Sequence, residues 1–266
     1  MDSPFRDQIR PVVLVLPARN EAAVIGSVLA RVPTVVENHP VRVLVVDDGS
    51  TDATGSIAEA VGVEVVRIER SRGLGAALRR GLTEARSFRP AAVAFCDADG
   101  EYAPEELAAL VTPILRGHAH YVVGSRFDGR IGRMLPHRRI GNRVLTAALR
   151  RWIREPVTDG QSGYRALSPA ALGAFEIAHD YNYAQVLTCD LIAKGFGYAE
   201  VPISYSFRST GRSFVRLVPY LRHVVPTLLR QRAAQSSTTW RSKPTLASRQ
   251  RSRSNGPEGE IASTAA

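Results

Sequence analysis

The fold is decided by the stretch Ala91-Ala92-Val93-Ala94-Phe95-Cys96-Asp97-Ala98-Asp99. Its first six residues form an apolar run, which is typical of a strand buried on both faces of a parallel sheet. The two carboxylates then emerge at the carboxyl end of that strand, where open α/β sheets bind their ligands. Because alternate residues of an extended chain point the same way, Asp97 and Asp99 are expected to converge on one cation. Such hard oxygen ligands suit Mg²⁺ or Mn²⁺ bound to substrate phosphates.

Around this stretch the first half of the chain alternates between strand-like and helix-like segments. The alternation predicts an α/β fold, a Rossmann-like and mostly parallel sheet with helices on both faces. The expected strands are 12–16, 41–46, 63–68, 91–96 and 121–124, and the expected helices are 21–32, 52–61, 74–88 and 104–116.

The second half of the chain is less regular. Helices are expected at 139–154, 169–175 and 184–194, and a strand at 198–205. Residues 214–229 place apolar side chains at helical spacing between arginines, which predicts an amphipathic helix kinked by Pro219 and Pro226. The expected organisation is an N-terminal arm over 1–10, an α/β domain over 11–212, an amphipathic C-terminal helical segment over 213–232 and a disordered basic tail over 233–266.

Composition narrows the class of protein. The chain has 266 residues, a formal net charge of +10 and two cysteines. This length suits one sizeable domain with appendages, and two cysteines are too few for a disulfide framework. Because no apolar stretch reaches about 18 residues, no transmembrane helix is expected. The first ten residues are polar and lack the apolar core of a signal peptide, so a cytoplasmic location is predicted.

Arginines gather in the segment 126–154, where only Asp128 and neighbouring Glu155 oppose them. Basic patches attract the phosphates of nucleotides, anionic lipids or nucleic acid, whereas the plainer interpretation is a solvated helix face. The segment 214–230 offers a similar choice between lying in a bilayer interface and packing on the sheet. These two segments lead to the hypothesis of peripheral association with an anionic membrane surface, while nucleic acid is the less favoured partner.

Polar motifs also follow the first two predicted strands. Residues 17–21 are Pro-Ala-Arg-Asn-Glu, and residues 47–52 are Asp-Asp-Gly-Ser-Thr-Asp. Parallel strands bring both motifs to the edge that carries Asp97 and Asp99. A nucleotide at this edge would find backbone donors after the first strand, and Asp47 as an acceptor for its base or ribose. Helix capping is the alternative role for the carboxylates in 47–52.

Together these motifs resemble family 2 glycosyltransferases of the GT-A fold, over roughly residues 12–214. The resemblance rests on residues 17–21, Asp47-Asp48-Gly49-Ser50, Arg72-Gly73-Leu74-Gly75-Ala76-Ala77, Asp97-Ala98-Asp99 and Gly124-Ser125-Arg126. Further motifs are similar to the branch of dolichol- or polyprenyl-phosphate mannosyl- and glucosyltransferases: Asp159-Gly160-Gln161-Ser162-Gly163-Tyr164-Arg165, Glu200-Val201-Pro202-Ile203, and Arg208 with Gly211 and Ser213.

The resemblance implies an inverting transfer of a hexose from a nucleotide-diphospho-sugar (GDP-mannose or UDP-glucose type) to a polyprenyl phosphate. It implies that Asp99 holds Mg²⁺ or Mn²⁺ on the diphosphate, helped by Asp97 or Glu101. The implied nucleotide-binding residues are Pro17, Arg19, Glu21, Asp47, Asp97 and Ala98. Arg126 and Arg208 are expected at the phosphates, with charge added by Arg212, and Asp159 is expected near the sugar and acceptor. The catalytic candidates are therefore Asp99, Asp159 and Arg126.

The acceptor is inferred from a missing base. A phosphate is already ionised near neutral pH and needs arginines rather than a general base. Residues 181–185, Tyr-Asn-Tyr-Ala-Gln, carry no acid where many hydroxyl-directed relatives have one, although Asp159 and Asp180 remain candidates. At two positions the chain differs from the residues that are common in the family: Glu101 stands where the family often has Gln, and Phe214 where it often has Lys. These differences weaken the assignment of the family's residue roles to this chain.

Three alternatives stay open. The first is the same fold acting on a hydroxyl acceptor in polysaccharide, glycolipid or natural-product synthesis. The second is a dinucleotide-dependent oxidoreductase, disfavoured because Gly73-x-Gly75 is followed by Leu78 at the third glycine position. The third is a non-enzymatic phospholipid or nucleic-acid binder, which would not need Asp97 and Asp99.

Overall fold

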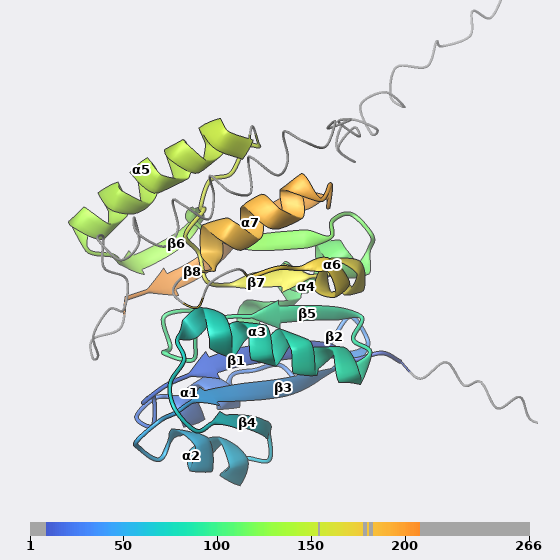
Figure 1. Cartoon of the computed structure of the whole chain (residues 1–266), viewed down its shortest axis with the longest axis vertical. Helices are drawn as coiled ribbons and strands as arrows, with labels where there is room; N and C mark the ends of the chain where they lie inside the picture. Colours follow the sequence, from blue (N-terminus) through green and yellow to red (C-terminus); the bar gives the residue numbers. More distant parts are fainter. Residues whose placement is uncertain (1–8, 154, 178–179, 181–182, 208–266) are drawn as a thin grey trace, which may run out of the picture.

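The computed structural model describes residues 9–153, 155–177, 180 and 183–207. The predicted helix over 213–232, the predicted tail, Arg208 and Arg212 lie outside the described residues. The described chain is an eight-stranded mixed sheet with helices on both faces, as Figure 1 shows. This confirms the predicted fold class.

Parallel pairing dominates the sheet. Its strand order is β2–β3–β1–β5–β7–β6–β8, and β4 also pairs with β3. β1 runs parallel to β3 and β5, β3 to β4, and β6 to β8, whereas β7 runs antiparallel to both β5 and β6. The strands are β1 Val12–Ala18, β2 Val35–Val36, β3 His39–Asp48, β4 Glu64–Ile68, β5 Ala92–Phe95, β6 Tyr121–Arg133, β7 Arg165–Leu167 and β8 Tyr198–Ser206.

Two apolar cores form because side chains alternate across the sheet. Along β1, Val12, Leu14 and Leu16 pack in the core beneath α1, α2 and α4. Val13 and Val15 point the other way, into the core beneath α3, α6 and α7. The helices are α1 Ile25–Ala30, α2 Thr54–Ala60, α3 Leu74–Ala85, α4 Leu107–Leu115, α5 Pro136–Ile153, α6 Pro169–Ala174 and α7 Ala184–Ala193, with short 3₁₀ turns at Arg86–Phe88 and Pro104–Glu106.

Helix starts and one strand differ from the prediction. α1 begins at Ile25 rather than at residue 21, after a turn in which the Glu21 carbonyl accepts the amides of Val24 and Ile25. α2 begins at Thr54 rather than at residue 52, where the Asp52 side chain accepts the Thr54 amide. β6 continues to Arg133 instead of ending at residue 124, because it keeps pairing with β8 through two register shifts.

The sequence pattern missed β7 altogether, although this strand lies in the middle of the sheet. It is only three residues long and begins with Arg165, whose side chain is fully buried. The Arg165 guanidinium donates to the carbonyls of Ser162, Gly160 and Ala184 and to two hydroxyls, those of Tyr121 and Thr188. These hydrogen bonds compensate for the lost hydration of the charge and allow an arginine to occupy a core position.

No helix among the described residues combines the length and the apolar character needed to cross a bilayer.

Replacing Arg165 tests whether these hydrogen bonds hold the sheet together. We expect Arg165→Leu to lower the free energy of unfolding by about 3 kcal/mol or more, because several buried carbonyls lose their donor. Urea unfolding followed by circular dichroism measures the change. Arg150→Leu is the control, because Arg150 is exposed on α5. Equal unfolding midpoints for the two variants would contradict the role given to Arg165.

Candidate active site

Three strand ends meet at one edge of the sheet, as the sequence predicted. In the β1–β3 pair, Ala18 lies opposite Asp47. Beyond β5, the Ala98 amide donates to the Pro17 carbonyl at 3.3 Å. The segments 17–21, 47–52 and 97–99 therefore border a single region at the carboxyl ends of β1, β3 and β5, the part of an open α/β sheet where ligands bind.

The two loops that follow β1 and β3 are hydrogen-bonded to each other. Asn20 donates its amide to Ser50 Oγ (3.0 Å), and its Oδ1 atom accepts the Thr51 amide (2.8 Å). The Glu21 amide donates to Thr54 Oγ1 at 2.8 Å. Asn20 has a φ of +55°, a conformation that asparagine tolerates better than most residues. The nearby side chain of Arg19 is exposed, and that of Glu21 is half-buried.

The three carboxylates of 47–52 hold backbone amides. Asp48 accepts the amides of Arg72 (2.8 Å) and Gly73 (3.0 Å), so it fixes the loop before α3. Asp52 accepts the amides of Thr54 and Ala22, at 3.0 and 3.2 Å. Neither carboxylate belongs to an N-cap residue, because Ala53 and Gly73 stand at the caps of α2 and α3 and make no side-chain cap hydrogen bond. Asp48 and Asp52 therefore stabilise the loops that lead into these helices. Asp47 is also buried and accepts the Ser50 amide at 2.9 Å, and its contact with a nucleotide stays a prediction.

The carboxylates after β5 divide into two groups. Asp97 and Asp99 are half-buried on either side of the buried Ala98, and Asp99 Oδ1 accepts the Glu101 amide at 3.0 Å. The Glu101 carboxylate instead accepts the hydroxyl of Tyr205 from β8, at 2.7 Å. Within the described ranges, no three His, Cys, Asp or Glu side chains gather to hold a metal ion.

The donor set fits a cation that is shared with a substrate. Mg²⁺ and similar ions commonly take one or two carboxylates from the protein and the rest of their ligands from substrate phosphates and water. Asp97 and Asp99 supply carboxylates of this kind at the sheet edge. In this conformation Glu101 is bound to Tyr205, so its predicted help to the metal would require that hydrogen bond to change.

Gly163 lies beside Asp97, and the sequence analysis did not identify it as a site residue. Its amide donates to Tyr102 Oη at 2.7 Å, and its carbonyl accepts the Tyr183 hydroxyl at 3.2 Å. Burial raises the pKa of both phenols, so each stays protonated. A Cβ atom at Gly163 would lie 3.2 Å from both Asp97 Oδ2 and Tyr102 Oη, so a larger residue would require these side chains to move by a few tenths of an ångström. The available signal was the position of Gly163 within the motif 159–165.

Arg126 and Asp159 bind each other in a buried bidentate ion pair. Arg126 Nε lies 2.6 Å from Asp159 Oδ2, and Nη2 lies 2.8 Å from Oδ1. The side chains are only 6% and 0% exposed, and the guanidinium carbon stands 5.1 Å from the ring centre of Tyr205. The pair anchors the first residue of the motif 159–165 on β6. Direct contact of either residue with substrate stays a prediction and would require the pair to open.

Asp180 and Asp190 have cationic partners as well. Asp180 forms an ion pair with Arg79 of α3, with Nη2 and Oδ1 2.5 Å apart. Asp190 lies within α7 and binds Lys194 at 2.8 Å, away from the strand ends. Residues 181 and 182 lie outside the described residues. Asp180 and Asp190 are therefore both engaged in ion pairs, and either would have to leave its partner to act as a general base.

Gly73, the residue before α3, allows a close approach between two segments of the chain. It has a φ of +99°, and a Cβ there would lie 2.7 Å from the Asp180 carbonyl oxygen. The amide of Gly75, the second residue of α3, donates to the same carbonyl at 2.9 Å. The close approach accounts for Gly73 without a dinucleotide and weighs against the oxidoreductase alternative.

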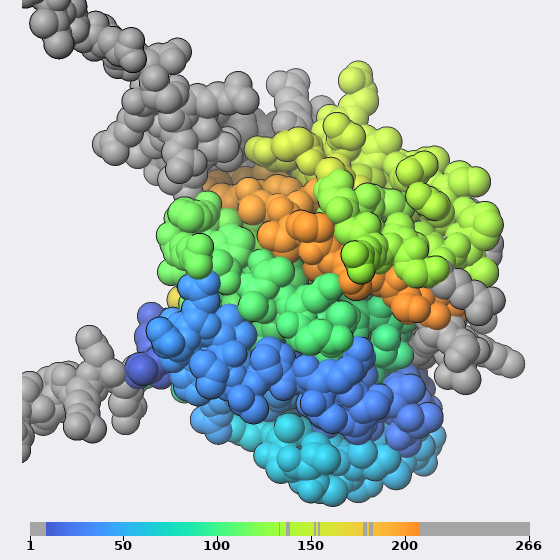
Figure 2. Space-filling view, turned by 180° about the vertical axis from the view of Figure 1, so that it is seen from behind, coloured from blue at the N-terminus to red at the C-terminus, as the bar shows by residue number. Residues whose placement is uncertain are grey.

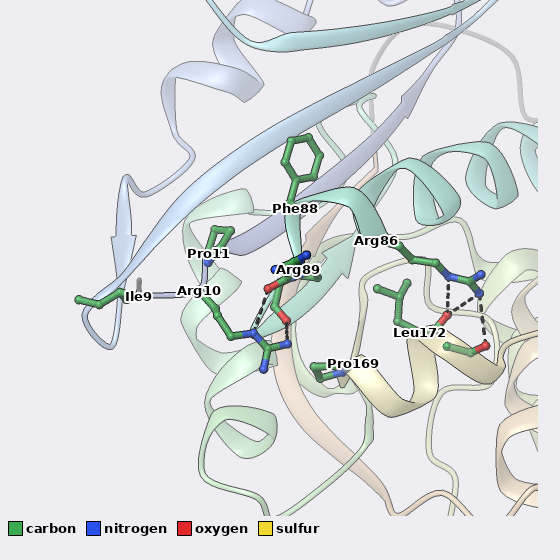
Figure 3. Close-up of a pocket in the computed structure, with 10 residues that line it drawn as sticks. Ile9, Arg10, Pro11, Arg86, Phe88, Arg89, Pro169 and Leu172 are labelled. Carbon is green, nitrogen blue, oxygen red and sulfur yellow. Dashed lines mark hydrogen bonds between the residues drawn. The ribbon is translucent and has the colours of Figure 1, made fainter. Parts of the chain in front are cut away.

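A pocket of about 560 Å³ lies at the opposite edge of the sheet, beside Pro11 and Pro90, and Figure 3 shows it. Two arginines that line it donate to backbone carbonyls: Arg10 to Arg89 and Pro90, and Arg86 to Leu172. The bonds of Arg10 link the residues that precede β1 to those that precede β5. The bonds of Arg86 link the turn after α3 to α6. The pocket is therefore separate from the edge that carries Asp97.

The family model described as Glycosyl transferase family 2 matches residues 13–174. Polyprenol monophosphomannose synthase of Mycolicibacterium smegmatis is 31% identical over 223 residues, which cover 77% of this chain and 82% of that protein. Glycosyltransferase AglJ of Haloferax volcanii is 29% identical over 202 residues, 75% of this chain, and the chain spans only 64% of AglJ.

Solved structures show the same architecture with ligands. Glucosyl-3-phosphoglycerate synthase from Mycobacterium tuberculosis, in complex with Mn²⁺, UDP and glucosyl-3-phosphoglycerate, superposes with a TM-score of 0.66 at 28% identity. The match covers 84% of this chain and 80% of that one.

The tight fit at Gly163 generates a prediction about the Asp97 region. We expect Gly163→Ala to weaken Mn²⁺-dependent UDP binding about tenfold and to destabilise the fold by about 1–3 kcal/mol, since the new methyl group displaces Asp97 or Tyr102. Isothermal titration calorimetry and urea unfolding measure the two effects. Gly173→Ala is the matched control, because a Cβ there meets nothing within 4 Å. Unchanged UDP binding in Gly163→Ala would remove Gly163 from the site.

Asp52 generates a prediction about pH. Burial acts to raise its pKa, but the hydrogen bonds that it accepts from Thr54 and Ala22 outweigh burial and lower the pKa below its ordinary value. The ionised carboxylate therefore stabilises the fold in full above the unfolded-state pKa of about 3.9, and this contribution disappears as the pH falls through the lower folded-state pKa.

We expect Asp52→Asn to destabilise the protein at neutral pH, and we expect the difference from wild type to shrink as the pH falls below the unfolded-state pKa of about 3.9 and the wild-type carboxylate becomes protonated. Urea unfolding over this pH range measures the difference. Glu69→Gln, at an exposed carboxylate, is the control. A constant difference between Asp52→Asn and wild type at all pH values would refute the assignment.

Proposed function

Because the chain belongs to glycosyl transferase family 2, we propose that it transfers a hexose with inversion from a nucleotide-diphospho-sugar to a polyprenyl phosphate. The family match spans more than half of the chain. The donor class is supported by the solved relative that binds UDP and Mn²⁺ at 28% identity. The acceptor class is supported by the relative named polyprenol monophosphomannose synthase.

The choice of a polyprenyl phosphate as acceptor is supported mainly by the ion pairs that engage the acids beside the site. Asp159 is bound by Arg126, and Asp180 is paired with Arg79. A hydroxyl acceptor must lose a proton to a base, whereas a phosphate monoester already carries an anionic oxygen. A site whose acids are engaged by arginines suits the phosphate acceptor better.

The proposed reaction is a single displacement. An oxygen of the acceptor phosphate forms a bond to the anomeric carbon, and the bond from that carbon to the diphosphate oxygen breaks. The nucleoside diphosphate leaves with the electron pair, and no proton has to be removed from the acceptor. Arginine side chains balance the charge of the two phosphate groups and hold them in line. Arg208 and Arg212 are candidates for this role and lie outside the described residues.

The donor side has a separate task. Asp97 and Asp99 would hold the Mg²⁺ or Mn²⁺ ion, which neutralises the charge of the departing diphosphate. Gly163, held by Tyr102 and Tyr183, has no side chain and so leaves space for the Asp97 carboxylate beside it. Pro17 and Arg19 border the nucleotide along the first strand end, with Asp47 beside them at the end of β3.

A second candidate acceptor is a hydroxyl group on a small phosphorylated molecule. It is favoured by the glucosyl-3-phosphoglycerate synthase structures, which cover 84% of this chain. This reaction would require one of the engaged acids, Asp159 or Asp180, to act as the base.

The metal site is tested by Asp99→Ala. We expect this variant to lose the Mn²⁺-dependent thermal stabilisation that a UDP- or GDP-sugar gives the wild type, and to lose at least about a hundredfold in turnover, because the diphosphate charge is no longer neutralised. Its melting temperature without ligands should stay near that of the wild type. Glu105→Ala is the control, at an exposed acid paired with Arg31. Retained metal-dependent turnover in Asp99→Ala would end the metal assignment.

The acceptor is tested with radiolabelled UDP-glucose and GDP-mannose. Transfer of label to polyprenyl phosphate, recovered in the organic phase, is the expected result. Label transferred only to 3-phosphoglycerate in the aqueous phase would favour the second candidate and overturn the polyprenyl phosphate acceptor.

A further inference from the structure

The outward face of α5 carries the two most exposed large apolar side chains of the described residues. Ile140 is 65% exposed and Val144 is 63% exposed. They stand four residues apart, so they form one stripe along the helix. In Figure 2 the yellow-green surface of the α5 region lies at the upper right of the view. Exposing two large apolar groups side by side is unfavourable in water unless a partner covers them.

The inward face of α5 fixes which way this stripe points. Thr146 and Leu149 are buried, and Thr146 Oγ1 accepts the Gly160 amide at 3.1 Å. Gln185 of α7 donates to the Leu145 carbonyl at 3.1 Å. The helix is therefore packed on α7 and on the loop that carries Asp159, and Ile140 and Val144 lie on the opposite side, exposed among the described residues.

The charged side chains of α5 itself are all positive. Pro136–Ile153 contains no Asp or Glu, and Arg139, Arg143, Arg150 and Arg151 are exposed along it. Among the described residues, none of these four arginines forms a salt bridge, while Arg143 lies over the ring of Phe127. Apolar side chains flanked by arginines match the boundary of an anionic bilayer, where apolar groups enter the acyl region and guanidinium groups bind lipid phosphates.

We propose that the outward face of α5 binds an anionic lipid surface through Ile140 and Val144, with Arg139, Arg150 and Arg151 contacting the headgroups. The apolar stripe distinguishes this partner from a nucleic acid, which would use the arginines and leave Ile140 and Val144 exposed. The binding itself is independent of the proposed function. Its use for catalysis rests on that function: α5 separates the surface from the Asp159 loop by about one helix diameter, ~10 Å. A polyprenyl phosphate in the same bilayer would then lie close to the site.

Vesicle sedimentation of the full chain tests this proposal. We expect the protein to sediment with phosphatidylcholine vesicles that contain phosphatidylglycerol, and much less with phosphatidylcholine alone. Ile140→Ser/Val144→Ser should reduce the partition coefficient at least about tenfold, since two apolar groups no longer enter the bilayer. Arg150→Gln/Arg151→Gln should reduce it about fivefold for each arginine and should weaken its dependence on salt.

Val35→Ser/Val61→Ser is the matched control, because these valines are 57% and 55% exposed on other elements. It should bind vesicles as the wild type does. All variants should keep the Mn²⁺-dependent stabilisation by a nucleotide-sugar, which separates this test from that of the proposed function. Unchanged vesicle binding in Ile140→Ser/Val144→Ser would overturn the proposal. So would equal binding to neutral vesicles, or a stripe variant that changes only the oligomeric state in gel filtration.

Discussion

The described structure depends on burying the guanidinium group of Arg165 without a carboxylate partner. Carbonyl and hydroxyl oxygens from β6, α7 and the loop 159–163 supply its hydrogen bonds instead. A buried charge is tolerated only when its polar atoms are satisfied, so each of these segments must be in place at once. The requirement couples the irregular second half of the chain to the parallel half, because Arg165 begins the strand that joins β5 to β6.

The same loop connects this buried charge to the site. Its first acid, Asp159, is bound by Arg126, and Gly163 is held from both sides by tyrosine hydroxyls beside Asp97. Asp159 and Asp180 are thus engaged by arginines, while the carboxylates Asp97 and Asp99 lie half-buried at the carboxyl end of β5. Under the proposed function, Asp97 and Asp99 would hold a cation bound to a diphosphate, and an anionic acceptor would need no base from the acids that the arginines engage.

α5 packs on the loop that carries Asp159 and exposes its other side. One side of the helix holds the Gly160 amide through Thr146, and the other exposes Ile140 and Val144 among arginines. A single helix therefore links the position of the Asp159 loop to the chemistry of the outer surface. In Figure 1, α5 lies at the end of the molecule opposite α2.

Local sequence patterns were enough to predict the parallel half of the fold and the gathering of residues 17–21, 47–52 and 97–99 at one edge. Apolar runs report burial residue by residue, and parallel strands place their carboxyl ends together wherever they pair. Only the tertiary structure decided the partners: Arg126 with Asp159, 33 residues away, and Glu101 with Tyr205, 104 residues away. It also decided β7, whose three residues are too few to show a period and whose arginine has no local sign of burial. Such pairings are selected by packing and desolvation across the folded chain, which local pattern does not encode.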